Sequence, residues 1–140
     1  MALNSFREAG LILSVAFLSI GLSFLGLFIG QQNYGFIGTI SAVGLIGLSI
    51  NDSIIVLSHI KEEAEKKDIS KAEIVEVVIR STRHIITTSL TTLGGFVPLI
   101  FASVFFKPLA WAMSIGVLGA TLTALLYIPA MFVVMKKINY

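Results

Sequence analysis

The stretch "GLIGLSINDSIIVLSHI" at residues 44–60 belongs to a long apolar run in which one carboxylate, Asp52, stands among hydrocarbon side chains. The run extends roughly from Phe36 to Ile60, which is long enough for a helix to cross a hydrocarbon core of about 30 Å. Backbone groups in lipid must be hydrogen-bonded within the protein, so a helix is the expected form. The stretch therefore predicts a transmembrane helix that carries an acid.

The composition of the whole chain is that of a membrane protein. Of 140 residues 56% are hydrophobic and only 13% are charged, and the mean hydropathy is +0.93. So few charges would not cover the surface of a soluble domain. The net charge of +2 gives no reason to expect nucleic acid as a partner, and the lack of cysteine excludes disulfides and thiolate chemistry. The polar start "MALNSFREAG" does not resemble a cleavable signal.

Four apolar runs divide the chain, at about residues 9–30, 36–60, 85–106 and 109–135. Each is long enough to span a bilayer as a helix, whereas the short alternating strands of a barrel are absent. We therefore expect an all-α integral membrane fold, in which residues 1–140 form a single transmembrane domain of four helices in contact with the lipid bilayer.

The charged segment between the second and third runs has a helical pattern of its own. "SKAE" at Ser70–Glu73 fits a capping box, and the residues after it alternate between one apolar and one charged face. We expect a short amphipathic helix at about residues 70–81, lying at the cytoplasmic interface. The sequence leaves a second interpretation open, in which these residues extend the third span into the cytosol.

The distribution of basic residues predicts the orientation. Four spans place both termini and the long connection on one side, which holds nine of the ten Lys and Arg residues: Arg7, Lys61, Lys66, Lys67, Lys71, Arg80, Arg83, Lys136 and Lys137. The other side holds Lys107 alone. Cytoplasmic loops carry the excess of positive charge, so the N- and C-termini are expected in the cytoplasm.

Asp52 is the only carboxylate inside any expected span, at a depth of about 12 Å from the cytoplasmic end. A charge at mid-membrane costs about 2.5–3.5 kcal/mol on insertion scales, and such residues face a bundle interior or a water path. The carboxyl group avoids this cost when it binds a proton, as a proton-coupled transporter requires. The alternative is a structural group that is hydrogen-bonded between helices. For His59 we expect a place at the interface rather than in a relay.

A polar face runs along the third span in "RHIITTSLTTLGGFVP". Thr91 and Thr92 would lie near the depth of Asp52, and the threonines of this face could bond either to its carboxyl group or to carbonyls of their own helix. Gly94, Gly95 and Pro98 predict a kink, and Pro129 predicts one in the fourth span. No catalytic motif, metal-ligand spacing or phosphate loop is present, so we expect neither an enzyme nor a bound cofactor or metal.

Three motifs in order give a resemblance to a known family: "INDSI", "TSLTTLGGFVPL" and "GATLTALLYIPA". They resemble the last four transmembrane helices of the resistance–nodulation–division (RND) efflux permeases. The resemblance implies proton/substrate antiport across the bacterial inner membrane with H⁺ as the coupling ion. It also implies a homotrimer with a periplasmic adaptor and an outer-membrane channel. Because the first repeat and the periplasmic domains are missing, we expect a C-terminal fragment that is inactive without the remainder of the permease.

The resemblance also implies site residues. Asn51, Asp52 and Thr88 fall in the proton-relay region of the family, and Thr92 joins them as a candidate because of its depth. Asn51 stands where the drug-efflux branch has a lysine, and Ser81 stands where it has an arginine. Two rival functions remain open. One is a four-helix small multidrug transporter that acts as a dimer, although the acid that it needs in the first span is absent. The other is a structural membrane subunit that transports nothing.

The nine-to-one charge bias leads to a topology that can be tested directly. Reporter fusions at Asn33 and Lys107 should be periplasmic, and a fusion at Lys67 should be cytoplasmic, because positive loops stay inside. Paired alkaline phosphatase and green fluorescent protein fusions measure both states at each position. A periplasmic reporter at Lys67 would rule out the four-span arrangement.

Overall fold

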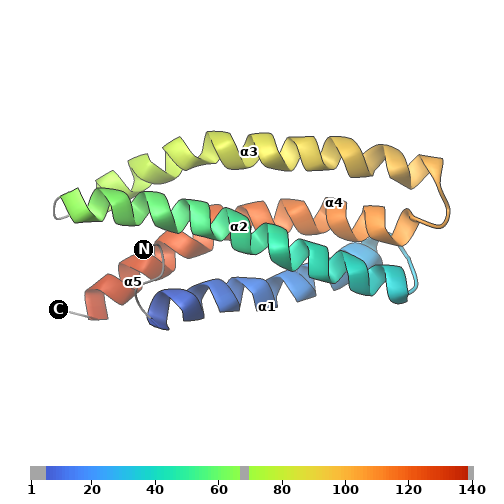
Figure 1. Ribbon diagram of the computed structural model, residues 1–140, viewed down its shortest axis with the longest axis horizontal. Helices are drawn as coiled ribbons and strands as arrows, with labels where there is room; N and C mark the ends of the chain where they lie inside the picture. The colour runs from blue at the N-terminus through green and yellow to red at the C-terminus, as the bar shows by residue number, and fades with distance from the viewer. Residues whose placement is uncertain (1–5, 67–69, 139–140) are drawn as a thin grey trace.

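A computed structural model describes residues 6–66 and 70–138, and it is helical almost throughout (Figure 1). The elements in chain order are α1 (Phe6–Ile29), α2 (Phe36–Lys66), α3 (Lys71–Ala102), α4 (Lys107–Leu122), the π-helix η1 (Thr123–Tyr127) and α5 (Ile128–Ile138). The last three follow one another without a break. Four stretches are long and apolar enough to cross a membrane: Phe6–Ile29, Phe36–Lys66, Lys71–Ala102 and Lys107–Val134. The all-α fold and the four spanning helices are thus confirmed.

The short interfacial helix expected at residues 70–81 is wrong, because these residues are the first turns of α3. The capping box does form: the Ser70 N–H donates to Glu73 Oε2 at 2.7 Å and the Glu73 N–H donates to Ser70 Oγ at 3.3 Å. No glycine or proline interrupts the sequence from Lys71 to Leu93. Moreover, Ile74, Val77 and Ile85 are buried along one continuous face. The amphipathic segment and the third span are therefore one helix.

Close packing of α1 against α4 and η1 fixes the centre of the bundle. Gly30 contacts Trp111, and Leu22 contacts Gly119. The hydroxyl oxygens of Ser14 and Tyr127 are 3.0 Å apart. Each step of eight residues along α1 is thus matched by eight residues in the opposite direction along the last span. At Gly26 an added Cβ would lie 2.8 Å from the Ala112 Cα, so only glycine permits this approach.

The two longest helices, α2 and α3, share few contacts along most of their length. Both pack against α4, which contacts all three other spans. Figure 1 shows α2 and α3 side by side at their connected ends, from which they diverge, so that the N-terminal end of α2 lies beside α1. Asp52 lies on α2 between these two regions.

Two prolines inside helices, Pro98 and Pro129, differ in their effect on helix geometry. Pro129 has no N–H to bond the Leu125 carbonyl, and Leu125 lies within the π-helical η1. Figure 1 shows the last span changing direction between α4 and α5. Pro98, by contrast, lies inside α3, which stays helical up to Ala102. The kink expected from Gly94, Gly95 and Pro98 remains a prediction.

The α1–α4 contact predicts opposite effects of one substitution at two glycines of the same helix. Gly26→Ala should destabilise the bundle by about 1–3 kcal/mol, because the new methyl group meets backbone atoms that cannot move aside. Gly21→Ala has open space around it and should be neutral or stabilising by up to about 1 kcal/mol. Denaturant titration of the two variants in detergent micelles measures this difference. Equal stability of the two would contradict the observed packing.

Candidate functional site

Asp52 lies inside the helix bundle, as its position in the sequence predicts. Its side chain is 1% exposed, and its Oδ1 atom has no hydrogen-bond partner among the described residues. Buried carboxylates normally have a partner, because an unpaired charge away from water is very costly. The orphan oxygen makes Asp52 the candidate functional group of the bundle interior.

The edge of α2 that carries Asp52 faces α3. His59 and Glu63 follow Asp52 by seven and eleven residues, so the three side chains share one edge of the helix. His59 Nδ1 lies 2.7 Å from Ser81 Oγ of α3, and Glu63 Oε1 lies 3.9 Å from an Arg80 guanidinium nitrogen. This edge is therefore the one that meets α3.

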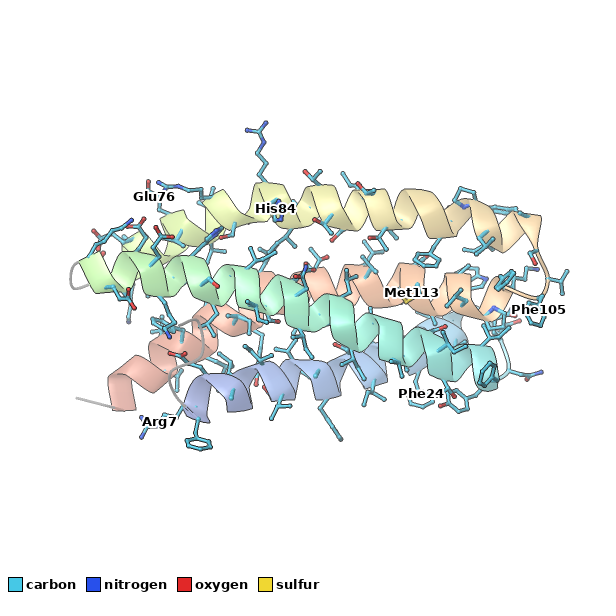
Figure 2. All side chains as sticks on the ribbon, viewed as in Figure 1. Arg7, Phe24, Glu76, His84, Phe105 and Met113 are labelled. Atoms are coloured by element: carbon cyan, nitrogen blue, oxygen red, sulfur yellow. The ribbon has the colours of Figure 1, made fainter. Side chains whose placement is uncertain are left out.

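The same contact gives the register of the two antiparallel helices. Ser81 lies opposite His59, so seven residues back along α2 and seven forward along α3 bring Asp52 level with Thr88. His84, one turn from Thr88, interacts electrostatically with Asp52. Figure 2 shows His84 about midway along α3. By this register Asp52, His84 and Thr88 lie at neighbouring levels along the two helices, with the His84 side chain exposed.

The threonines of α3 use their hydroxyl hydrogens within their own helix. Thr88 Oγ1 donates to the His84 carbonyl at 3.1 Å, and Thr92 Oγ1 donates to the Thr88 carbonyl at 2.9 Å. This is the second of the two arrangements that the sequence left open. The Thr88 oxygen keeps a lone pair that can accept a hydrogen bond, and Asp52 can donate such a bond only when its carboxyl group is protonated.

The other sequence-predicted residues lie apart from the buried carboxyl group. Asn51 is exposed, because adjacent helical residues point about 100° apart. Gly94, Gly95 and Pro98 lie on the exposed surface of α3, and Pro129 is half-buried in α5. Their roles in the relay or in bending remain predictions. In the part of the chain that the structure describes, no three His, Asp or Glu residues gather as metal ligands would.

Several interhelical polar contacts were not predicted. The Ser19 and Ser49 hydroxyls bond at 2.5 Å between α1 and α2, and the Ser89 and Thr121 hydroxyls bond between α3 and α4. At the end that holds the α2–α3 connection, Lys61 Nζ lies 2.9 Å from Glu8 Oε2, with both side chains mostly buried. Glu8 directly precedes the first expected span and Lys61 directly follows the second, so the sequence already placed these opposite charges at the same side of the membrane.

Sequence comparison relates the chain to known proteins. The sequence profile of the AcrB/AcrD/AcrF family matches residues 1–136. The chain is 30% identical over 126 residues to the multidrug export protein AcrF of Escherichia coli K12, covering 84% of this chain and 12% of that protein. It is 26% identical over 133 residues to the swarming motility protein SwrC of Bacillus subtilis 168, covering 91% and 12%.

A third relative is a component of another transport system. The chain is 32% identical over 85 residues to the protein translocase subunit SecF of Gemmatimonas aurantiaca, covering 58% of this chain and 25% of that subunit. The chain therefore spans about an eighth of AcrF and SwrC and a quarter of SecF.

The Ser19–Ser49 contact can be measured by a double-mutant cycle. We expect Ser19→Ala and Ser49→Ala to be non-additive, with a coupling energy of about 0.6–1.7 kcal/mol, as for other interhelical hydrogen bonds in membranes. Ser58 donates only to the carbonyl of Ile54 in its own helix, so the cycle of Ser19→Ala with Ser58→Ala is the matched control. Additive effects of the Ser19 and Ser49 substitutions would show that this bond contributes nothing.

Proposed function

Because this chain belongs to the AcrB/AcrD/AcrF family, which confirms its resemblance to RND permeases, we propose that it forms four membrane helices of a proton-driven exporter. Asp52 is the proton-binding group of this segment. The observation that carries the proposal is the burial of Asp52 at 1% exposure with an unpartnered Oδ1. A purely structural carboxyl group would have its oxygens satisfied by neighbouring helices.

The chemistry of coupling follows from the surroundings of this group. In the closed bundle the neutral acid is favoured, because a buried unpaired carboxylate is costly. The neutral acid can donate its hydrogen to Thr88, which is ready only to accept. When α2 and α3 move apart and water enters between them, the carboxylate becomes hydrated and the proton leaves. Protonation thus favours one arrangement of the two helices and ionisation favours the other, which links proton flow to movement.

The three relatives suggest which part of transport this segment performs. Their names describe drug export, swarming motility and protein translocation, yet each is similar to more than half of this chain. A segment common to such different tasks suits energy coupling better than cargo selection. We therefore place substrate recognition in the remainder of the permease, and we expect this chain alone to export nothing.

The wider assignment also belongs to this proposal. The segment lies in the bacterial inner membrane with both termini in the cytoplasm, and it works in a trimer with a periplasmic adaptor and an outer-membrane channel. Its coupling ion is H⁺, and it neither catalyses a reaction nor binds a cofactor. Multidrug export is the activity that the similarity to AcrF favours.

The structure offers less support to the two rivals. A small multidrug transporter needs a titrating acid in its first span. The one acid of α1, Glu8, lies in its first turn and forms an ion pair with Lys61 at 2.9 Å. A structural subunit would be favoured by a fully bonded Asp52, whereas Oδ1 has no partner.

Substitution of Asp52 in a complete permease that carries this segment tests the proposal. Asp52→Asn should preserve the fold, because an amide is nearly isosteric, but should lower proton-coupled export by at least about tenfold, because an amide cannot transfer the proton. Export is measured in membrane vesicles under an imposed pH gradient, at equal abundance of each variant.

Two further variants complete the experiment. Ser58→Ala is the control on the same helix, since that hydroxyl bonds only within α2, and it should leave export unchanged. Asp52→Leu should in addition reduce the abundance of folded protein, because it alters packing inside the bundle. Wild-type export by Asp52→Asn would identify Asp52 as a structural group and end the proposal.

A further inference from the structure

The two histidines of the chain lie on α2 and α3, on one side of Asp52 along the bundle axis, and the side chains of both are exposed. By the register of these antiparallel helices, Asp52 is level with Thr88, His84 with Val56, and His59 with Ser81. Successive levels are about one helical turn, or 5.4 Å, apart. His84 therefore lies between Asp52 and His59 along the bundle axis, on the way to the connected ends of the two helices.

Hydrogen bonds determine which nitrogen of His59 holds its proton. Ser81 Oγ donates to the Val77 carbonyl at 3.0 Å, so its lone pairs are what it offers to His59 Nδ1 at 2.7 Å. In the neutral ring Nδ1 is then the donor, and Nε2 is left as the basic nitrogen. The Ser81 contact fixes the ring in place without using the nitrogen that can take up a further proton.

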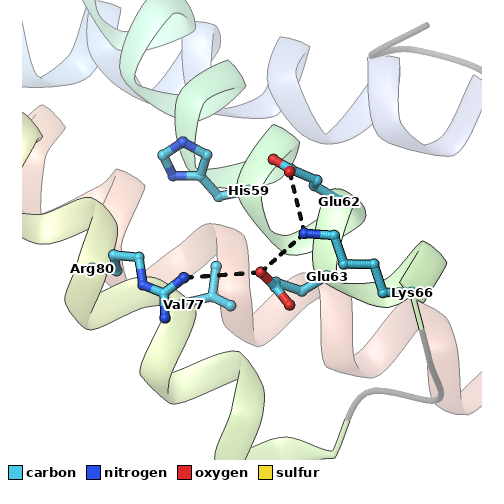
Figure 3. A pocket seen from close by; sticks show the side chains of 6 residues that line it. All are labelled: His59, Glu62, Glu63, Lys66, Val77 and Arg80. Atoms are coloured by element: carbon cyan, nitrogen blue, oxygen red, sulfur yellow. Dashed lines mark hydrogen bonds and ion pairs between the residues drawn. The ribbon is translucent and has the colours of Figure 1, made fainter.

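His59 also lines a cavity at this end of the bundle (Figure 3). The cavity has a volume of about 220 Å³, which is room for several water molecules. Its other lining side chains are Glu62, Glu63, Lys66, Val77 and Arg80. The side chain of His59 is exposed, unlike the buried Asp52 two turns away.

Charges around the cavity are balanced. Lys66 lies 3.3 Å from Glu62 and 3.6 Å from Glu63, and Arg80 lies 3.9 Å from Glu63 and 3.6 Å from Glu76. The Lys61–Glu8 ion pair lies at the same end of the bundle. His59 thus adjoins paired acids and bases and is not next to one isolated charge. It is the one imidazole among the side chains that line the cavity.

We propose that His84 and His59 form the passage by which protons move between Asp52 and the water of this cavity. The inference rests on the proposed function, since it needs a proton on Asp52. The carboxyl group gives its proton to the free nitrogen of His84, which leaves a carboxylate and an imidazolium. His84 passes the proton through water to His59 Nε2, and the doubly protonated His59 ring releases it to the cavity. Both rings end neutral, and each step moves one proton.

The neighbouring side chains cannot take this role. Val56 and Val77, on the facing edges of α2 and α3, carry no exchangeable proton. The hydroxyl hydrogens of Ser81 and Thr88 are engaged with backbone carbonyls of α3. Histidine can accept and release a proton near neutral pH, which suits a path that is used in every transport cycle.

The test uses a complete permease that carries this segment, in vesicles with a pH-sensitive dye on the cavity side. His59→Asn keeps an amide donor for Ser81 but cannot titrate, and His84→Asn is its counterpart on α3. Each should lower the rate of proton release at least about tenfold. Ser81→Ala is the structural control, because it removes the hydrogen bond between Ser81 and His59 but keeps an imidazole that can carry a proton. It should lose much less.

Chemical rescue separates a proton path from a packing role. His59→Ala should regain a large part of its rate when imidazole is added on the cavity side, because the free base can replace the lost ring. A packing defect would not respond to added base. Equal losses in Ser81→Ala and His59→Asn, or a failure of imidazole to rescue His59→Ala, would overturn the inference.

Asp52→Asn serves as the reference that separates the two proposals. If Asp52→Asn abolishes coupling while both histidine variants release protons at the wild-type rate, the histidine passage is wrong and the proposed function stands. If Asp52→Asn couples normally, the proposed function fails and the passage falls with it.

Discussion

The bundle is constrained by the need to satisfy every polar group inside hydrocarbon without help from water. Its hydroxyl groups meet this need locally: Ser53, Thr88 and Thr92 each donate to the carbonyl four residues earlier in their own helix. Others pair across helices, as Ser19 does with Ser49. Among the described residues three buried side-chain oxygens have no partner, those of Ser23, Ser114 and Asp52, and of these three only the carboxyl group of Asp52 can ionise.

Tight glycine contacts supply the rigidity against which such a change can act. Gly26 and Gly30 bring α1 against the α4 backbone and Trp111, and Gly116 receives Leu45 of α2. The α1–α2–α4 unit is therefore close-packed, whereas α2 and α3 meet mainly at their connected ends. A change in the spacing of α2 and α3 would break few contacts between these two helices, while α3 could keep its packing against α4.

Much of this arrangement could be predicted from the sequence. Four apolar runs are enough to predict four spans, and the cost of a membrane-embedded charge predicts that Asp52 points inward. The extent of α3 was misjudged because the amphipathic and apolar patterns were treated as separate elements. The buried positions Ile74, Val77, Ser81, Ile85 and Ser89 continue in one phase across the supposed boundary, and this signal was present in the sequence.

The details of the site depend on features that a single sequence does not fix. Which serine meets which across α1 and α2 depends on helix register, and close approaches such as Gly26 on Ala112 set that register in three dimensions. Whether Thr88 bonds Asp52 or its own helix depends on a rotamer, and both choices satisfy the hydroxyl group. His59 was assigned to the interface alone because its partner, Ser81, lies across the connection on another helix.

The π-helix in the last span has a consequence for how the bundle can move. A π turn accommodates one residue more than an α turn, so conversion of η1 to regular α-helix would turn α5 by about 100° relative to α4. Tyr127 would then swing away from Ser14, and their 3.0 Å contact would be lost. Gly119 lies before η1, so its contact with Leu22 of α1 would be kept. In the last span α4 is thus held by its glycine contacts, and η1 allows α5 to rotate relative to α4.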